Sequence, residues 1–513
     1  MKTSILLSIA VLFASHLYAQ KSDVTITIDP SETDITISKH IYGHFAEHLG
    51  RCIYDGIYVG EDSKDIPHTD GVRNDIIEAL KELQIPNLRW PGGCFADTYH
   101  WKDGIGPKDQ RPTIVNRWWG GATEDNSFGT HDFLNLCEVL EAEPFLSVNV
   151  GSGTVQETID WVQYTNHDGV SPKADLRREN GRKDPWAVTY WGVGNEAGGC
   201  GGHMTKEYYR DIYRKFATFM PGWSGEKEVY RIAAGAFDGD EAWTEELMKN
   251  VPRNLIEAIG FHHYAAVSWT STKGPSVNFE EEFYFKVMDK ALQMEPSLDR
   301  HIAVMDKYDE ENKVALFVDE WGGWYDTEEE FQNGVLYQQS TIRDALIAGA
   351  TLNIFNNRAD RIKMANLAQT VNVLQAVILT DGSKMLLTPT YHVMNMYKVH
   401  QDAKLLNTSV ENANYTWSEK SVPAISTSAS MKNGKGHISI TNVDFDQKYT
   451  VSVTGVNFKN VSGTIVNSAN VQDYNGFDTP EKIGIKEFKG IKNKKGNLEI
   501  EIPAHSVVML EWE

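Results

Sequence analysis

Cysteine, positive charge and long apolar runs are all scarce in this chain of 513 residues. Four cysteines (Cys52, Cys94, Cys137 and Cys200) are too few for a fold that depends on a disulfide framework, although the sequence does not decide whether any of them pair. The 49 lysines and arginines are outnumbered by 71 aspartates and glutamates, for a formal net charge of -22. This excess argues against nucleic acid or an anionic membrane as a partner and suits a neutral ligand.

The most conspicuous apolar stretch is at the N-terminus. Lys2 precedes the run "ILLSIAVLFA", and the small residue Ala19 follows it. A basic residue, a short apolar run and a small residue are typical of a signal peptide, and the run is too short to span a bilayer. We therefore expect residues 1–19 to be a signal peptide, and the protein to be exported to the periplasm or the extracellular space.

Between residues 40 and 380, short apolar runs alternate with amphipathic helical stretches, which predicts βαβ units and a parallel sheet. An open sheet that binds a dinucleotide would carry a G-x-G-x-x-G turn after an early strand, and no well-placed one is present. A closed (β/α)₈ barrel is therefore favoured. The expected strands cover residues 41–47, 87–93, 144–150, 187–196, 230–237, 258–265, 314–321 and 351–357. Helices are expected at residues 72–83, 130–142, 154–166, 206–220 and 338–349.

After about residue 395 the pattern changes to alternating apolar and polar residues separated by turn signals such as "KNGKG". This pattern is typical of an antiparallel β-sandwich. The segment "VTITIDP" near the N-terminus alternates in the same way. The expected organisation is a signal peptide over 1–19, a strand within 20–39 that joins the sandwich, a catalytic barrel over 40–394 and the sandwich over 395–513.

Polar residues at the carboxyl ends of the expected strands are the candidates for chemistry, because barrel enzymes place their reactive groups there. Any one of them could be a hydrogen-bonded loop anchor, but that explanation would have to hold at most of the strand ends independently. In chain order these residues are Glu47, Arg89 to Cys94, Asn149, Asn195 with Glu196, His262 with Tyr264, Glu320 and Asn356.

Two of these carboxylates are expected to face each other. Glu196 ends the fourth strand and Glu320 the seventh, on opposite sides of a barrel mouth. Such a pair suits glycosidic bond cleavage, in which one group protonates the leaving oxygen and the other attacks the anomeric carbon. Asp319 adjoins Glu320 but should point the opposite way, because side chains alternate along a strand. Asn195 is positioned to bind a sugar hydroxyl beside the reacting centre.

The segments around these residues carry a family resemblance. "WGVGNE" and "FVDEWGGWY" resemble the two catalytic motifs of clan A glycoside hydrolases. Further landmarks lie collinearly along nearly the whole chain: "IYGHFAEHLGRCIYDGIYVG", "LRWPGGCFAD", "FHHY", "RDALIAG" and "MANLAQTVNVLQAVI". Together they resemble glycoside hydrolase family 51, whose principal activity is α-L-arabinofuranosidase.

The resemblance implies a retaining, exo-acting enzyme, with Glu196 as general acid/base and Glu320 as nucleophile. Its substrates would be arabinoxylan, arabinan or their oligosaccharides. No metal or organic cofactor would be required, and the protein would be a homo-oligomer, often a hexamer in the family. The substrate-binding residues implied are Glu47, Arg89, Cys94, Asn195, His262, Tyr264 and Gln369.

One loop departs from the family pattern. Many relatives have a tryptophan shortly after the acid/base glutamate, as in "NE-x-W-G-C-G-G", whereas this chain reads "NEAGGCGG" with Gly198 at that place. The acid and its neighbouring amide are intact, so the departure bears on the leaving-group subsite and the preferred polymer rather than on hydrolysis.

Three alternatives remain at this point. His44, Glu47 and His48 fit the H-x-x-E-H pattern of inverted zinc peptidases, but "IYGHF" is expected to be a strand, and no third ligand is evident. A non-catalytic carbohydrate-binding protein on the same barrel should lack one of the two glutamates, and this chain has both. A retaining β-xylosidase or endo-β-glucanase could use the same fold and carboxylates.

Overall fold

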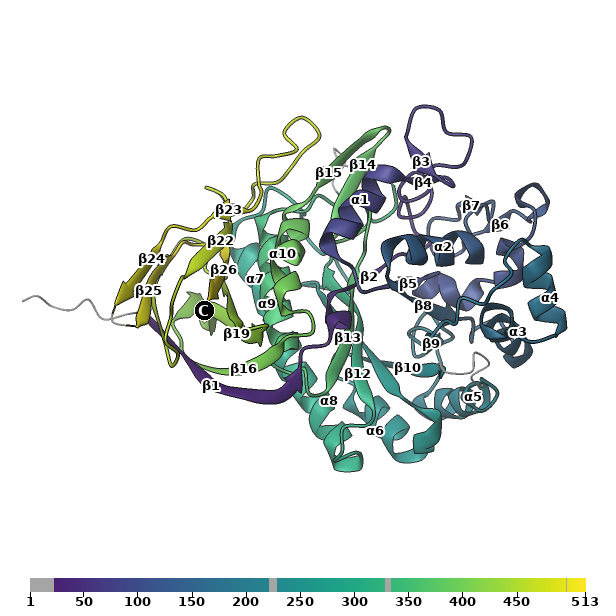
Figure 1. The fold of residues 1–513 in the computed structure, drawn as a ribbon, viewed down its shortest axis with the longest axis horizontal. Helices are drawn as coiled ribbons and strands as arrows, with labels where there is room; N and C mark the ends of the chain where they lie inside the picture. The colour runs from purple at the N-terminus through teal and green to yellow at the C-terminus, as the bar shows by residue number, and fades with distance from the viewer. Residues whose placement is uncertain (1–22, 221–227, 328–333, 495) are drawn as a thin grey trace, which may run out of the picture.

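The computed structural model describes residues 23–220, 228–327, 334–494 and 496–513 (Figure 1). The expected signal peptide over residues 1–19 lies outside these ranges. None of the helices described is both long enough and apolar enough to cross a membrane. Figure 1 shows two parts side by side, a barrel surrounded by helices and a sheet domain, with α7, α9 and α10 between them.

Eight parallel strands close into a barrel in the order β10-β11-β12-β13-β2-β5-β8-β9, which confirms the expected fold class. Each strand runs in the same direction because helices and loops return the chain between them. The strands are β2 (Gly43–Phe45), β5 (Asn87–Trp90), β8 (Glu143–Val148), β9 (Tyr190–Val193), β10 (Tyr230–Phe237), β11 (Ala258–Ala265), β12 (Ala315–Gly323) and β13 (Ile362–Ala368).

The helices begin at capping residues that the sequence provides. The hydroxyls of Thr154, Ser171 and Thr205 each accept a backbone N–H at the first turn of α3, α4 and α5. The helices of the described chain are α1 (Asn74–Leu83), α2 (Thr130–Leu140), α3 (Val155–Asn166), α4 (Pro172–Glu179), α5 (Lys206–Thr218), α6 (Glu241–Asn250), α7 (Glu281–Leu292), α8 (Met294–Tyr308), α9 (Ile342–Asn356) and α10 (Pro389–Tyr397).

The expected eighth strand at residues 351–357 is wrong. Residues 351–356 form the last part of α9, and the eighth strand is β13, farther along the chain. Every residue of α9 is buried, so its sequence lacks the alternation of apolar and polar faces that marks a surface helix. A short apolar run without that alternation cannot be told from a buried strand by periodicity.

Asn356 consequently lies away from the barrel mouth. Its side chain accepts a hydrogen bond from Tyr42 Oη at 2.7 Å and donates one to Ser428 Oγ at 3.1 Å. Ser428 belongs to the sheet domain, so Asn356 joins the two domains. The residue that follows the true eighth strand is Gln369.

Ten strands form the sheet domain, in the order β23-β22-β26-β20-β19-β16-β1-β21-β25-β24. β1 (Val24–Thr36) pairs antiparallel with β16 and parallel with β21, and the other pairs are antiparallel. The other nine strands are β16 (Lys404–Glu411), β19 (Ile425–Lys432), β20 (Lys435–Asn442), β21 (Tyr449–Thr454), β22 (Ser462–Val466), β23 (Lys486–Glu487), β24 (Ile491–Lys494), β25 (Asn497–Ile502) and β26 (Ser506–Trp512).

The sheet domain has a core of its own and a broad contact with the barrel. Its core contains Ile26, Ile438 and Leu510, from strands far apart in the sequence. Helix α9 packs against β19, β20 and β26. The described chain also forms four short two-stranded ribbons: β3 (His68–Thr69) with β4 (Val72–Arg73), β6 (Ile114–Val115) with β7 (Thr123–Glu124), β14 (Ile378–Asp381) with β15 (Lys384–Leu387), and β17 (Asn414–Trp417) with β18 (Lys420–Pro423).

Candidate active site

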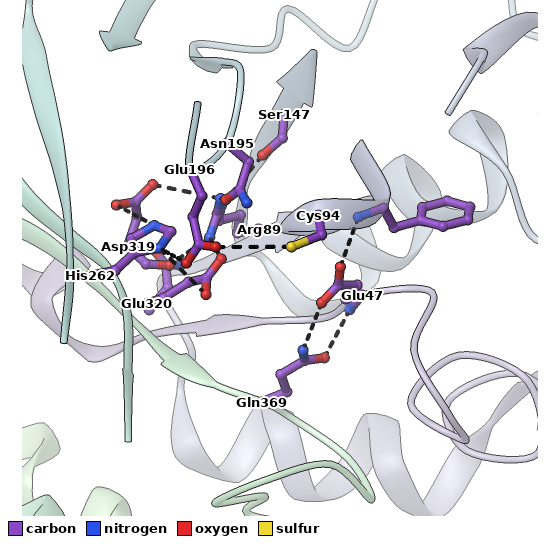
Figure 2. Close-up of polar contacts among 12 residues, drawn as sticks. Glu47, Arg89, Cys94, Ser147, Asn195, Glu196, His262, Asp319, Glu320 and Gln369 are labelled. Carbon is purple, nitrogen blue, oxygen red and sulfur yellow. Dashed lines mark hydrogen bonds and ion pairs between the residues drawn. The ribbon is translucent and has the colours of Figure 1, made fainter. Parts of the chain in front are cut away.

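Glu196 and Glu320 meet at the carboxyl ends of the barrel strands (Figure 2). Glu196 lies three residues beyond β9, and Glu320 is in β12. One carboxylate oxygen of each lies within 4.8 Å of the other. The backbone of Glu196 has φ of +40°, a conformation that costs a non-glycine residue energy and tends to occur at functional sites. The two carboxyls are thus close enough to act on one bond.

Glu320 is held by two donors. Arg89 Nη1 donates to its Oε1 at 2.8 Å, and Tyr264 Oη donates to its Oε2 at 2.7 Å. Arg89 is almost fully buried, and its Nη2 donates to Asn195 Oδ1 at 2.6 Å. A guanidinium is always charged in proteins, so it stabilises a carboxylate at this position. The Asn195 amide oxygen is thus occupied by Arg89, and its amide nitrogen donates to the sulfur of Cys200 at 3.7 Å, a weak acceptor.

Asp319 and Glu320 do not point in opposite directions as strand alternation predicted, because both carboxyls lie against Arg89 and His262. Asp319 Oδ1 accepts from the backbone N–H of Phe261 at 3.1 Å and lies 3.4 Å from His262 Nε2. Burial of this carboxyl favours its neutral form, but the nearby charges of Arg89 and His262 outweigh burial and lower its pKa. Asp319 therefore anchors the groups that contact the two glutamates.

His262 lies between the two glutamates. Its Nδ1 is 2.9 Å from Glu196 Oε1 and 3.5 Å from Glu320 Oε2. Burial opposes the charged imidazolium, but Glu320 and Asp319 more than compensate and raise the pKa of His262 to about 10. Burial also raises the pKa of Glu196, and the negative charge of Glu320 adds to this rise, while the hydrogen bond with His262 opposes it. A carboxyl with a raised pKa keeps its proton to higher pH.

A second group of polar side chains forms the opposite wall. Glu47 Oε1 accepts from Phe95 N–H at 3.1 Å and from Trp119 Nε1 at 3.0 Å, and its Oε2 accepts from Gln369 Nε2 at 3.0 Å. Burial, with a smaller contribution from Glu320, raises the pKa of Glu47 to about 7. A small cavity of about 40 Å³ lies between this wall and the glutamate pair. Its lining includes Glu47, Cys94, Trp119, Glu196, Tyr264, Glu320, Trp324 and Gln369.

The backbone comes close to the nucleophile candidate at the "PGG" turn. A Cβ atom added to Gly93 would lie 2.7 Å from Glu320 Oε1 and 3.5 Å from Asn195 Nδ2. A side chain at this position would displace the Glu320 carboxylate and fill the cavity. Position 93 therefore requires glycine, because any side chain there would collide with the Glu320 carboxylate.

Cys94 and Cys200 form a disulfide, which the sequence had left undecided. Cys94 thus lines the cavity as half of a cystine rather than as a thiol. Cys200 was not among the expected site residues, although it lies only four residues after Glu196. Cys52 and Cys137 are free and buried.

A larger cavity of about 640 Å³ adjoins the small one and shares Glu196, Tyr264 and Trp324 with it. Its other lining includes His262, His263 and two aromatic residues with large exposed fractions, Trp269 at 57% and Phe237 at 41%. Neither residue was among the candidates predicted from the sequence: Trp269 lies in a loop, where no periodicity marks it, and Phe237 ends β10 but is apolar.

The glycine in the loop after Glu196 has a structural explanation. A Cβ atom at Gly198 would lie 3.2 Å from the ring of Trp243 in α6. Trp243 is buried, stacks on Tyr209 with centroids 5.5 Å apart, and donates to Ala234 O at 3.1 Å. An indole at position 198 would therefore need space that Trp243 occupies.

Two other sequence candidates have supporting roles. Asn149 accepts backbone N–H groups from Ser152 and Gly153 and donates to Tyr99 O, so it is a loop anchor. Asp97, which was not among the candidates, accepts the backbone N–H of Asn195 at 2.9 Å. Burial raises the pKa of Asp97 to about 7.

The H-x-x-E-H pattern does not form the helical zinc site of a peptidase. His44 lies in β2, and His48 follows it in a loop, where its ring nitrogens contact Trp90 Nε1 at 3.1 Å and Glu124 Oε2 at 3.4 Å. Glu47 faces Gln369 instead. Across the described ranges, the clusters of side chains close enough together to hold a metal ion all include Glu196, and neither His44 nor His48 belongs to them.

A parallel barrel with two opposed carboxyls at its mouth defines a class, the glycoside hydrolases. Two family models match this chain: the α-L-arabinofuranosidase 1 domain at residues 79–282 and the α-L-arabinofuranosidase C-terminal domain at residues 319–506. A relative from Bacteroides ovatus, named an intracellular exo-alpha-L-arabinofuranosidase, is 48% identical, and the match covers 100% of both chains.

Solved structures agree. The GH51 arabinofuranosidase from Xanthomonas axonopodis pv. citri has a TM-score of 0.93 at 41% identity, covering 96% of this chain and 100% of that one. An α-L-arabinofuranosidase from Thermotoga maritima, solved with arabinose, has a TM-score of 0.83 at 30% identity, covering 95% and 99%. The chain belongs to the α-L-arabinofuranosidases of glycoside hydrolase family 51, and the resemblance seen in the sequence is confirmed.

The expectation of export is corrected by the same comparisons. The Bacteroides ovatus relative matches this chain from end to end and is named intracellular. The expectation depended on composition alone, namely a lysine followed by a short apolar run, and residues 1–19 lie outside the described structure.

Proposed function

We propose that this glycoside hydrolase is a retaining, exo-acting α-L-arabinofuranosidase in which Glu196 is the general acid/base and Glu320 the nucleophile. The observation that carries the proposal is the pair of carboxylate oxygens within 4.8 Å of each other at the barrel mouth. Retaining glycosidases hold their two carboxyls about 5–5.5 Å apart, whereas inverting enzymes leave about 6.5–9.5 Å for a water molecule.

In the first step, Glu320 attacks the anomeric carbon of the arabinofuranosyl ring and forms a covalent glycosyl–enzyme ester. Glu196 gives its proton to the glycosidic oxygen, and the alcohol of the leaving sugar departs. Arg89 and Tyr264 hold the Glu320 carboxylate in position for attack. The raised pKa of Glu196 supports its role, because the group must carry a proton at the start of this step.

In the second step, Glu196, now a carboxylate, accepts a proton from water as the water attacks the anomeric carbon. The ester bond to Glu320 breaks, free arabinose is released, and Glu196 is protonated again. His262, hydrogen-bonded to Glu196 and close to Glu320, stabilises the negative charge as it passes from one carboxyl to the other.

The Bacteroides ovatus relative is named an exo-alpha-L-arabinofuranosidase, which supports exo action. The small cavity borders both glutamates and is the proposed site of the cleaved sugar. We assign Glu47 and Gln369, which line this cavity, to the furanose hydroxyls, together with Asn195, whose amide nitrogen lies close to the lining residue Gly93. Cys94 contributes a sulfur surface, and Trp119 orients Glu47.

We assign the larger cavity to the leaving sugar. It borders Glu196, the proton donor, and its exposed aromatic side chains Trp269 and Phe237 offer flat apolar faces suited to sugar rings. Arabinoxylan, arabinan and arabino-oligosaccharides are the proposed substrates, with the terminal non-reducing arabinofuranosyl residue removed. From the family resemblance we also propose a homo-oligomer, as in the hexamers common in the family, and light scattering after size exclusion would measure its size.

The activity test compares aryl α-L-arabinofuranoside with aryl β-xyloside and aryl β-glucoside as substrates. We expect kcat/KM to be highest by far on the arabinofuranoside. A preference for the β-xyloside or β-glucoside would favour the same-fold alternative, and absence of arabinoside cleavage would refute the proposal.

The role of Glu196 is tested by Glu196→Ala on a series of aryl arabinofuranosides. A good leaving group departs without a proton, so we expect the largest loss of kcat/KM on substrates with poor leaving groups. Equal losses across the series would count against Glu196 as the acid. Asn149→Ala, a change in a loop anchor, is the matched control and should show no dependence on the leaving group.

A further inference from the structure

The disulfide between Cys94 and Cys200 joins the two loops that enclose the proton donor. Cys94 begins the short helix η2 (Cys94–Thr98), just after β5, and Cys200 lies in the turn that follows Glu196. The two cysteines are 106 residues apart in the sequence. The first loop also supplies Phe95 N–H to Glu47, so the disulfide ties the furanose wall to the acid/base loop.

Both sulfur atoms lie against one oxygen of Glu196. Cys200 Sγ is 3.4 Å and Cys94 Sγ is 3.9 Å from Glu196 Oε2, as Figure 2 shows for Cys94. The other oxygen, Oε1, faces His262. A disulfide sulfur carries no hydrogen and cannot donate to a carboxylate, whereas a thiol is a weak donor. The disulfide thus covers Oε2 with a surface that does not stabilise negative charge there.

We propose that the Cys94–Cys200 disulfide is a positioning element for the Glu196 carboxyl, and that opening it weakens proton donation to the leaving group. This inference rests on the proposed role of Glu196 as general acid. With the disulfide closed, the Glu196 side chain is confined between sulfur and His262. With it open, two thiols can donate to Oε2 and favour the carboxylate, and the loop after Glu196 loses its covalent tether.

Opening requires a reductant of the dithiol class, such as dithiothreitol. The S–S bond of the protein breaks, Cys94 and Cys200 each gain one hydrogen, and the dithiol loses two hydrogens as its own sulfurs join. Two electrons and two protons are transferred in total. The cystine borders the cavity and is partly exposed, so a small dithiol can reach it.

The other charged and titratable groups around Glu196 are unchanged by this reaction. They are Arg89 of β5, Glu47 after β2, His262, His263 and Tyr264 of β11, Asp319 and Glu320 of β12, and Asp238 and Lys290 at the larger cavity. A change in the pH profile on reduction is therefore attributable to the sulfurs. A general acid must be protonated, so stabilising its carboxylate moves the alkaline limb of kcat/KM to lower pH.

The test measures pH profiles of kcat/KM for wild type before and after dithiothreitol, on an arabino-oligosaccharide and on a dinitrophenyl arabinofuranoside. Mass spectrometry after alkylation records whether Cys94 and Cys200 are paired. On reduction we expect a fall of roughly threefold to tenfold on the oligosaccharide above the pH optimum, and a much smaller change with the dinitrophenyl leaving group. The alkaline limb should move to lower pH.

Two double variants separate hydrogen bonding from tethering. Cys94→Ser with Cys200→Ser provides two donors and should reproduce the shifted limb, whereas Cys94→Ala with Cys200→Ala provides none and should leave the limb in place. Dithiothreitol should then have no effect on either. Cys137→Ala, which removes a free buried thiol in α2, should respond to the reductant as wild type does.

The outcomes distinguish this inference from the proposed function. If Glu196→Ala shows the leaving-group dependence of a lost acid, but reduction changes neither rate nor pH profile, only the disulfide inference is overturned. Alkylation of both cysteines in the enzyme as purified without reductant would also overturn it. If Glu196→Ala lacks that dependence, the assignment of Glu196 as the general acid is refuted, and the disulfide inference that rests on it is refuted as well. A thermal melt of each variant separates loss of fold from loss of positioning.

Discussion

The two cavities at the barrel mouth differ in what their walls offer a ligand: hydrogen-bonding groups held in place in the small cavity, and exposed aromatic faces in the larger one. In the small cavity, Glu47 is held by three donors, and Glu320 is held by two. In the larger cavity, Trp269 and Phe237 keep much of their surface exposed. The polar groups of the small cavity are therefore held in place before a ligand binds. The flat aromatic surfaces of the larger cavity allow a ligand to bind in more than one orientation.

In the proposed function, the small cavity recognises the arabinofuranosyl ring that is cleaved off, and the larger cavity recognises the leaving sugar. Fixed, buried hydrogen-bonding groups discriminate strongly, because a ligand that lacks a hydroxyl leaves a polar group unpaired. Aromatic faces discriminate weakly, because they bind many sugars by apolar contact. We therefore expect strict selection of the arabinofuranosyl ring and tolerance toward the sugar that follows it.

The largest effect is expected from Glu320→Ala, which removes the attacking atom from the small cavity. We expect kcat/KM on aryl α-L-arabinofuranoside to fall roughly 10⁴-fold or more. With a dinitrophenyl leaving group, added azide should restore turnover and yield the β-glycosyl azide. Residual activity within about tenfold of wild type would rule out Glu320 as the nucleophile.

A smaller loss is expected from Gln369→Ala, which breaks the pairing of the furanose wall. Glu47 Oε2 would lose its donor, and a buried polar group without a partner costs about 1–3 kcal/mol. We expect kcat/KM to fall roughly tenfold to a hundredfold for every substrate, whatever its leaving group. Gln369→Glu would place a second carboxyl beside Glu47 and should be at least as damaging. A loss confined to long substrates would contradict assignment of Gln369 to the cleaved sugar.

Trp269→Ala should have a modest effect that depends on the substrate. We expect kcat/KM on arabino-oligosaccharides to fall roughly threefold to tenfold, mainly through KM, and methyl α-L-arabinofuranoside to be affected least, because its leaving group is too small to reach the indole. Tyr208→Ala is the matched control, since Tyr208 is equally exposed on α5 but does not line the cavity. Equal losses on both substrates would remove Trp269 from the leaving-group site.

The smallest expected effect is a change in the pKa of Glu196 in the variant Glu320→Gln, measured by titration. Glu320→Gln removes a negative charge that raises the pKa of Glu196. The Glu196 pKa should therefore fall in this variant, while burial should still hold it above the ordinary value of a glutamate. Carboxyl ¹³C NMR of selectively labelled protein, with Glu196→Gln used to assign the resonance, would follow it. A higher pKa in Glu320→Gln would contradict the electrostatic coupling.

Sequence reasoning succeeded where a charged residue ended an apolar strand. Glu196, Arg89, His262 and Glu320 lie together because parallel strands bring their carboxyl ends to one rim of the barrel. The same reasoning placed Asn356 wrongly, because α9 is buried on every side and its sequence resembles a core strand.

Other features of the site could not be predicted from the sequence because they depend on the tertiary structure. Cys94 and Cys200 are 106 residues apart, so their pairing depends on tertiary structure. Trp119 and Trp269 extend from loops whose paths are set by packing. Gly198 was recognised as a departure from the family, but only the position of Trp243 explains it.

The stereochemistry of the reaction tests the central claim most directly. If the enzyme turns over aryl α-L-arabinofuranoside in aqueous methanol, the glycosyl–enzyme should be captured by methanol as well as by water. The account predicts, by ¹H NMR, methyl α-L-arabinofuranoside, because two displacements restore the original configuration. The β anomer as the initial product would mean a single displacement and would contradict the assignment of Glu320 as nucleophile and Glu196 as acid/base.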